Sequence, residues 1–96
     1  MTGLVVTETA REDLDRLIRT RSLPPSTRAR VRSAIEPLRA FPELGRALSG
    51  DWSGFRVVLG PWAWMLVVYA YDPAADRVAV VTIQDAREAR AVTSPE

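Results

Sequence analysis

The sequence predicts an α+β fold in which a helical hairpin packs on one face of a small antiparallel sheet, in the order β-α-α-β-β-β followed by a short helix. Three runs rich in Val, Ile, Leu and aromatic residues lie between residues 55 and 84, separated by turn residues, which predicts three consecutive antiparallel strands. Between residues 9 and 41, apolar residues recur at the spacing of two amphipathic helices. Each helix has one apolar stripe to bury, and one face of the sheet is the surface available for it.

The first predicted elements are a short strand and a helix. Leu4–Val6 is an apolar run long enough for one strand at the edge of the sheet. Thr9 and Glu12 have the spacing of a capping box, with Thr7 as the rival N-cap, so a helix is expected from about residue 9 to residue 21. The apolar stripe of this helix consists of Ala10, Leu14, Leu17 and Ile18.

The second predicted helix follows Leu23-Pro24-Pro25-Ser26, since prolines are tolerated in the first turn of a helix, where N–H groups are spare. Pro37 lies inside the helical pattern, where it removes one hydrogen bond and crowds the preceding turn, so we expect a kink or an early end there. Pro42 to Gly45 closes the segment. The stripe of this helix consists of Val31, Ala34, Ile35, Leu38 and Phe41.

The middle apolar run, from Trp62 to Tyr71, is expected to be the central strand of the sheet. It is apolar on both of its alternating sets, which is typical of a strand buried on both faces. Trp62 and Trp64 would then be core side chains on one face.

The third run is also mostly enclosed, with Val78, Val80 and Thr82 on one face and Ala79, Val81 and Ile83 on the other. After this strand, a short helix is expected from about Ala86 to Ala91.

Length and composition indicate one globular domain over residues 1–96. Hydrophobic residues make up 47% of the chain and charged residues 26%, the balance of a soluble protein rather than a disordered one. The sequence has no run of roughly 18 apolar residues, and its first residues lack the charged-then-apolar order of a secretory signal. We therefore expect a cytoplasmic protein with no membrane partner.

The absence of both Cys and His excludes most hydrolase chemistry. The chain has no thiolate, no imidazole base, no zinc site of the usual ligand types and no Ser-His pair. Its only clustered acids are Glu12, Asp13 and Asp15, which lie in the first turns of the first predicted helix, where the helix dipole favours acids. We expect no metal, no cofactor and no small-molecule substrate.

The charge is distributed unevenly. All 13 cationic residues are Arg; residues 1–50 hold nine of them against six acids, a net of +3, and residues 51–96 hold four against six, a net of −2. The segment from Arg16 to Ile35 has six Arg and no acid. Arg28, Arg30 and Arg32 in this segment are candidates for attracting nucleic acid or an acidic protein segment. The alternative is an Arg-rich, solvated helix face.

Three stretches of the chain together resemble the RelE/ParE superfamily, the toxins of type II toxin–antitoxin modules. They are Val-Thr-x-x-Ala-x-x-Asp-Leu-x-x-Leu at residues 6–17, Ala-Ile-x-x-Leu-x-x-x-Pro-x-x-Gly-x-x-Leu-x-Gly at 34–50, and Gly-Phe-Arg at 54–56 followed by Val-Tyr-x-Tyr-Asp at 68–72. The resemblance covers essentially the whole chain. It implies the fold derived above and a cognate antitoxin as partner. It also implies one of two activities: RelE-like members cleave messenger RNA on the ribosome, and ParE-like members inhibit DNA gyrase.

The residues that match the RelE-like nuclease set are few. In those nucleases, basic residues on the strand after the helices, an Arg on the next strand and an Arg-then-Tyr pair near the C-terminus form the site. Arg56 matches the first of these positions, but Val58 stands at the second. Arg87 matches the C-terminal Arg, with Arg90 close by, and Thr93 stands where the Tyr is expected. The next strand has no cation between residues 62 and 66.

Proton transfer is what this set lacks. Arg neutralises phosphate but is almost never deprotonated, so Arg56, Arg87 and Arg90 are poor proton shuttles. Asp85 or Glu88 beside Arg87 could act as the base; the alternative is that both are ordinary acids of a short helix.

The interpretation that best fits this deficit is a ParE-like toxin that acts by binding, with DNA gyrase as its target, neutralised by an antitoxin. The alternatives are a RelE-like ribosome-dependent mRNA endonuclease and an inert decoy that only titrates the antitoxin. The patch of Arg28, Arg30 and Arg32 would draw an acidic, initially disordered antitoxin segment across the helical hairpin or the sheet edge. Trp52, in a loop, is expected to be an exposed aromatic and a further partner contact.

Overall fold

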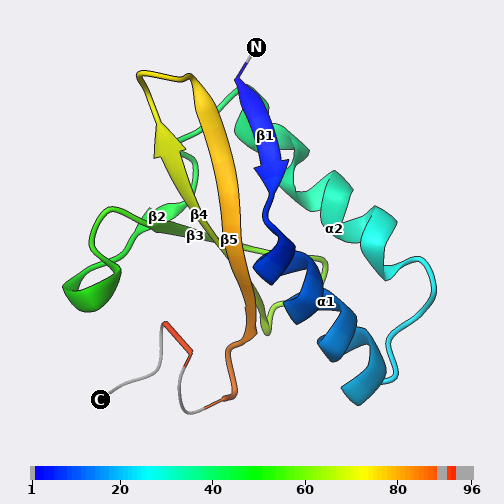
Figure 1. Cartoon of the computed structure of the whole chain (residues 1–96). Helices are drawn as coiled ribbons and strands as arrows, with labels where there is room; N and C mark the ends of the chain where they lie inside the picture. The colour runs from blue at the N-terminus through cyan, green and yellow to red at the C-terminus, as the bar shows by residue number, and fades with distance from the viewer. Residues whose placement is uncertain (1, 89–90, 93–96) are drawn as a thin grey trace.

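The computed structural model describes residues 2–88 and 91–92 and places a pair of helices on one face of a twisted sheet (Figure 1). The strands are ordered β1-β5-β4-β3-β2, with β1 parallel to β5 and every other neighbouring pair antiparallel. The predicted α+β class and helical hairpin are confirmed, and the sheet is mixed because β1 runs parallel to β5. The elements are β1 (Gly3–Val6), α1 (Glu8–Thr20), α2 (Thr27–Ile35), a 3₁₀ turn (Glu36–Arg39), β2 (Arg46–Ala47), a second 3₁₀ turn (Gly50–Trp52), β3 (Arg56–Leu59), β4 (Met65–Asp72) and β5 (Arg77–Asp85).

Strand β4 is the centre of the sheet and is buried on both faces, as its sequence predicts. Met65, Val67 and Tyr69 point to the helices and belong to the main core, which α1, α2 and β5 complete. Leu66 and Val68 point the other way into a smaller core that includes Val57, Trp52 and Phe55. This burial on both sides makes β4 the element against which the rest of the chain packs.

A bulge in β5 changes which of its side chains face the helices. Val68 lies opposite Thr82 and Tyr69 opposite Val80, so Val81 is an extra residue on β5. The alternation is reversed beyond this point. Ile83 therefore joins the main core, and the expectation that Thr82 would share the face of Val78 and Val80 is wrong.

Asp13 of α1 holds the bulge in place. Its Oδ2 accepts hydrogen bonds from Thr82 Oγ1 (2.6 Å) and from the backbone N–H of Ile83 (3.3 Å). Its Oδ1 accepts from Arg16 Nη2 (3.1 Å). An acid that the sequence placed in an ordinary first turn is thus a buried link between α1 and β5.

Helix α1 is capped by Thr7, the rival of the expected Thr9. The Thr7 side chain accepts from the Ala10 backbone N–H at 3.3 Å and donates to the Val80 carbonyl at 2.9 Å. Thr7 has an extended backbone directly after β1, which suits an N-cap and lets the same hydroxyl reach β5.

The predicted early end of the second helix is confirmed. Helix α2 stops at Ile35, and Pro37 lies in the 3₁₀ turn that follows.

No helix among residues 2–88 and 91–92 is long and apolar enough to cross a membrane.

The structure differs from the prediction at the start of β4 and after the end of β5. Strand β4 begins at Met65, so Trp62 and Trp64 lie in the β3–β4 turn, which is closed by hydrogen bonds from Gly60 N to Met65 O (2.9 Å) and from Met65 N to Trp62 O (3.0 Å). The helix expected at 86–91 is not seen: residues 86–88 and 91–92 form turns and bends, and residues 89 and 90 lie outside the described part. After β5, the Asp85 carboxylate accepts the Arg87 backbone N–H and the Asp85 carbonyl accepts the Glu88 N–H at 3.0 Å, which forms a turn.

Gly45 fits tightly against the sheet. Its N–H donates to Tyr69 Oη at 2.8 Å, and a Cβ added here would lie 2.8 Å from both that oxygen and the Val57 carbonyl oxygen. Backbone and a buried ring cannot easily move away, so this position excludes larger residues.

Gly45→Ala is therefore expected to lower the free energy of unfolding by about 1–3 kcal/mol through overpacking. Urea unfolding followed by circular dichroism measures it. Gly3→Ala is the matched control, because its Cβ would meet neighbours only at 3.5 Å or more. Equal stability of the two variants would contradict the packing described here.

Candidate functional site

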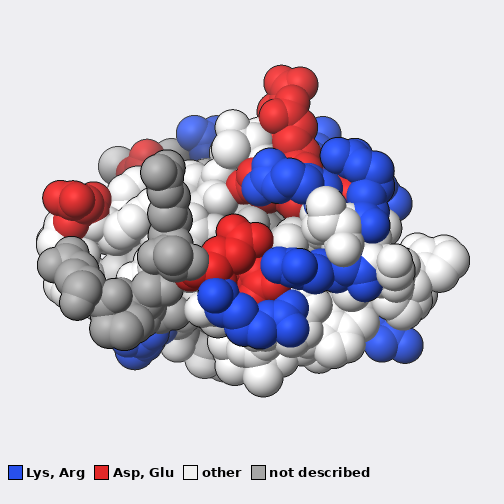
Figure 2. All heavy atoms as spheres, turned by 90° about the horizontal axis from the view of Figure 1, so that it is seen from below, with Lys and Arg blue, Asp and Glu red and all other residues white. Residues whose placement is uncertain are grey.

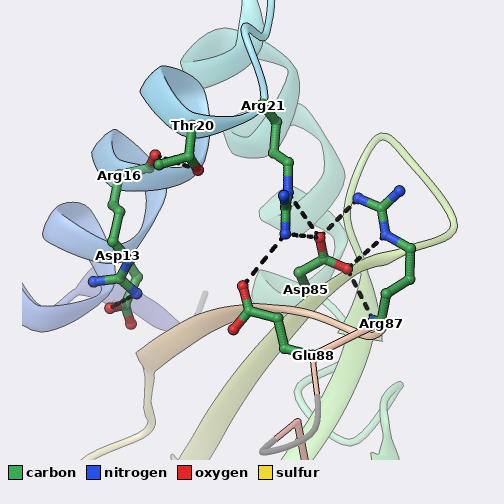
Figure 3. Close-up of polar contacts among 7 residues, drawn as sticks. All are labelled: Asp13, Arg16, Thr20, Arg21, Asp85, Arg87 and Glu88. Carbon is green, nitrogen blue, oxygen red and sulfur yellow. Dashed lines mark hydrogen bonds and ion pairs between the residues drawn. The ribbon is translucent and has the colours of Figure 1, made fainter.

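The acid at the end of β5 is buried and held by two arginines. Asp85 Oδ2 accepts from Arg21 Nε (3.1 Å) and from Arg87 Nη2 (2.7 Å). Its Oδ1 accepts from the Nε and the backbone N–H of Arg87, both at 2.9 Å. Figure 3 shows Asp85 between the two guanidinium groups, with Glu88 turned toward Arg21, 3.6 Å from it.

The local fold explains this convergence. The bulge at Val81 turns Asp85 to the helix side of the sheet. Helix α1 ends at Thr20, and Arg21 follows as its C-cap, with its N–H bonded to the Leu17 carbonyl. Arg87 comes two residues after Asp85 in the turn that the carboxylate itself begins.

This arrangement keeps Asp85 ionised. The side-chain hydrogen bonds from Arg87 lower the pKa of Asp85 from its ordinary value of 3.8 to about 2, against the opposing effect of burial. The same contact raises the pKa of Arg87. Both carboxylate oxygens are already accepting hydrogen bonds, so Asp85 is poorly suited to take a proton from a substrate.

Arg87 also begins a row of aromatic contacts. Its Cζ lies 4.7 Å from the centroid of the Trp64 ring, and Arg30 Cζ lies 5.8 Å from that of Trp62. The two indoles stack, with centroids 6.0 Å apart and planes 16° from parallel. Each indole already contacts a guanidinium and the other indole, and both are partly buried against the main core. The row ties α2, the β3–β4 turn and the C-terminal turn together.

Arg56 is separated from this cluster. It lies opposite Tyr69 on β4, whereas Asp85 lies opposite Met65. Four residues along a strand correspond to roughly 13 Å. The Arg56 guanidinium donates instead to the carbonyl oxygens of Gly45 (2.8 Å) and Glu43 (3.3 Å). The structure thus brings Asp85 and Arg87 together and leaves Arg56 elsewhere; Arg90 and Thr93 lie outside the described residues.

The residues predicted to contact a partner do not lie on one surface. Arg28 and Arg32, one turn apart on α2, line a groove, and Arg28 pairs with Asp15. Arg30 lies between them in sequence and points away, to Trp62. Trp52 is not the exposed aromatic that was expected: it is partly buried and packs edge-on against Phe55, with centroids 5.5 Å apart.

The groove lies where β1, α1 and α2 meet, and its volume is about 520 Å³. Its floor is apolar and its charged residues are three arginines and one acid. The lining residues are Leu4, Val5, Val6, Arg11, Leu14, Asp15, Arg28, Val31, Arg32, Ile35, Val80 and Ile83.

Sequence reasoning did not single out Asp13 or Arg21, although a signal was present. Both follow the apolar stripe of α1, three residues after Ala10 and four after Leu17 respectively. A charged residue on a buried stripe indicates a partner on the element beneath.

Residues 2–88 and 91–92 contain no group of three or more acids, His or Cys placed to hold a metal.

Asp85→Asn tests the buried ion pair through its pH dependence. Because the folded-state pKa is about 2 and the ordinary value is 3.8, the charged carboxylate stabilises the fold above about pH 4, and this contribution is lost as pH falls through 2. The variant is expected to be less stable at pH 7, with a deficit that shrinks between pH 4 and pH 2. Urea unfolding across this range measures it, with the exposed Asp51→Asn as control. A deficit that does not change with pH would contradict the assignment.

Comparison with known proteins identifies the family of the chain. A family model described as the ParE toxin of the type II toxin–antitoxin system parDE matches residues 4–90. No curated protein sequence matches the chain significantly.

Solved structures agree in fold. A chain of the RelBE2 toxin–antitoxin complex from Mycobacterium tuberculosis is 23% identical, with 88% of this chain and 96% of that chain covered and a TM-score of 0.66. A chain of the chromosomal ParDE system from P. aeruginosa is 14% identical, with 88% and 96% covered and a TM-score of 0.67. A chain of the intact E. coli RelBE complex is 14% identical, with 92% and 100% covered and a TM-score of 0.65. With the family model spanning nearly the whole length, the chain belongs to the ParE toxins of type II toxin–antitoxin systems, within the RelE/ParE superfamily.

Proposed function

We propose that the protein arrests growth by binding a target protein, DNA gyrase, and that it does not cleave RNA. The observation that carries this proposal is the state of Asp85 and Arg87. Arg87 matches the C-terminal Arg of a RelE-like site, and Asp85 is a candidate base beside it. The two are joined in an ion pair in which both carboxylate oxygens already accept hydrogen bonds. Both candidate targets, gyrase and the ribosome, work in the cytoplasm, so the proposal places the protein there.

Cleavage of RNA through its 2′-hydroxyl needs one group to remove a proton and another to protonate the leaving oxygen. Asp85 is ionised and fully hydrogen-bonded, and arginines do not exchange protons at neutral pH. Tyr69 and Tyr71 are distant, because they lie opposite Val80 and Val78 on β5, five and seven residues before Asp85. Burial raises the pKa of Tyr69, so the phenolate that could accept a proton is even scarcer at neutral pH.

The surface around the cluster also favours a protein target over RNA. Figure 2 shows acidic and basic side chains intermingled on the face seen from below. A surface that holds an RNA backbone is expected to be more uniformly basic. The stacked indoles of Trp62 and Trp64 already contact arginines, so they are poor platforms for nucleobases.

We further propose that a cognate antitoxin binds in the groove between β1, α1 and α2. Two of the similar structures come from toxin–antitoxin complexes. The apolar floor suits the apolar side chains of an extended or helical segment, and Arg11, Arg28 and Arg32 outnumber Asp15. Strand β1 is an edge strand beside the groove, so a segment could add to the sheet there. An acidic segment with spaced apolar residues is the expected occupant.

The target is tested by adding the purified protein to two assays. We expect inhibition of supercoiling by purified DNA gyrase, and we expect messenger RNA to stay intact in a ribosomal translation reaction. Adding the antitoxin should restore supercoiling. Cuts at codon positions that disappear in Arg87→Ala would establish the endonuclease instead. Activity in neither assay, together with tight antitoxin binding, would favour the decoy.

Antitoxin docking is tested by Arg32→Gln, with Arg30→Gln as the matched control. Both remove one charge from α2, but only Arg32 lines the groove. We expect Arg32→Gln to weaken antitoxin binding by roughly two- to fivefold at low salt and to reduce its salt dependence. Titration calorimetry at two salt concentrations measures both. Equal effects of the two variants would remove the groove as the docking site.

A further inference from the structure

The loop between α2 and β2 presents two large apolar side chains to solvent. Phe41 is 64% exposed and Leu44 is 58% exposed, although the second helical stripe predicted burial for Phe41. They flank a shallow groove of about 490 Å³ that is lined by Ala40, Phe41, Pro42, Glu43, Leu44 and Tyr71. None of these six residues lines the groove between β1, α1 and α2. The loop is therefore a second, separate surface.

Polar groups of the sheet hold this loop in one shape. Arg56 Nη1 donates to the carbonyl oxygens of Gly45 and Glu43, and the buried Tyr69 hydroxyl accepts the Gly45 N–H. Within the loop, the Leu44 N–H donates to the Phe41 carbonyl at 3.0 Å. The site that family resemblance assigns to catalysis at Arg56 is used here to fix a loop. A fixed apolar pair loses little conformational freedom on binding, which is the property of an interface anchor.

A carboxylate without an ion-pair partner among the described residues lies beside the apolar pair. Glu43 lines the loop groove and forms no ion pair with another described residue. Tyr71, which lines the same groove, donates to Asp76 Oδ1 at 3.1 Å, and this hydrogen bond is the largest cause that raises its pKa. The guanidinium of Arg56 is directed at backbone carbonyls. Glu43 and Asp76 make this surface better suited to a basic segment than to the acidic segment that the Arg-lined groove attracts.

We propose that the Phe41–Leu44 loop, with Tyr71, is the surface that binds the target, through a target segment carrying a large apolar side chain next to a basic one. The apolar side chain would lie between Phe41 and Leu44, and the basic one would pair with Glu43. This inference rests on the proposed function, since it supposes a toxin that acts by binding. It assigns target binding and antitoxin binding to two separate surfaces.

The test is the double variant Phe41→Ser and Leu44→Ser, with Leu59→Ser as the matched control. Leu59 is 55% exposed at the end of β3, outside the loop, so it offers the same kind of side chain elsewhere. We expect the double variant to lose at least about tenfold of its inhibition of purified gyrase and to stop arresting growth when expressed without antitoxin. Leu59→Ser should behave as wild type. Antitoxin affinity should stay within about twofold for both, which also shows that they fold.

Glu43→Arg tests the chemistry of the partner. Reversal of this charge should weaken gyrase inhibition and reduce its dependence on salt, while antitoxin affinity is unchanged or slightly higher. A double variant that arrests growth as strongly as wild type would overturn the proposal. Weakened antitoxin binding, or a changed oligomeric state in sedimentation, would overturn it as well, by assigning the loop to the antitoxin or to a second copy of this chain.

Failure of the proposed function has a different signature. If the wild type arrests growth but does not inhibit gyrase, the named target is wrong, and loss of growth arrest in the double variant still decides the role of the loop. If the wild type neither arrests growth nor inhibits gyrase, the proposed function fails and the loop proposal fails with it.

Discussion

The contact on which the structure most depends is the Asp85 carboxylate, buried between Arg21 and Arg87. It joins the end of α1 to the end of β5 and starts the turn that follows. A buried charge is tolerated only when its partners are well placed, because desolvation is costly. Here each oxygen accepts at least two hydrogen bonds or ion-pair contacts, and no buried side-chain nitrogen or oxygen among the described residues lacks a partner.

The same contact decides what the site can do. A carboxylate with a pKa near 2 between two guanidinium groups holds the turn in place and is a poor proton acceptor. Arg56 shows the same change of role, because it fixes the loop that carries Phe41 and Leu44. Under the proposed function, these residues are structural rather than catalytic. The surfaces proposed to bind partners are the Arg-lined groove and the apolar loop.

The sequence predicted the two helices, the strands β1, β3, β4 and β5 in their order, and the burial of β4, because these follow from local periodicity. It did not predict the two-residue strand β2, and it predicted a helix after β5 where turns are found. It did not predict the bulge at Val81, since both faces of β5 are apolar and no alternation marks the extra residue. The parallel pairing of β1 with β5 joins residues more than 70 positions apart, which no local pattern reports. Thr7 rather than Thr9 caps α1 because its hydroxyl also bonds β5.

The site was predictable only in part. Arg87 and Asp85 are near in sequence, and their proximity was foreseen. The contribution of Arg21 was missed because it lies four residues after Leu17, at the next position of the α1 stripe.

The most direct measurement of the central claim is the toxic potency per folded molecule of Asp85→Asn, at a temperature where circular dichroism shows the variant to be folded. If the ion pair is structural, potency per folded molecule equals that of wild type. A fully folded variant that has lost its potency would contradict this account.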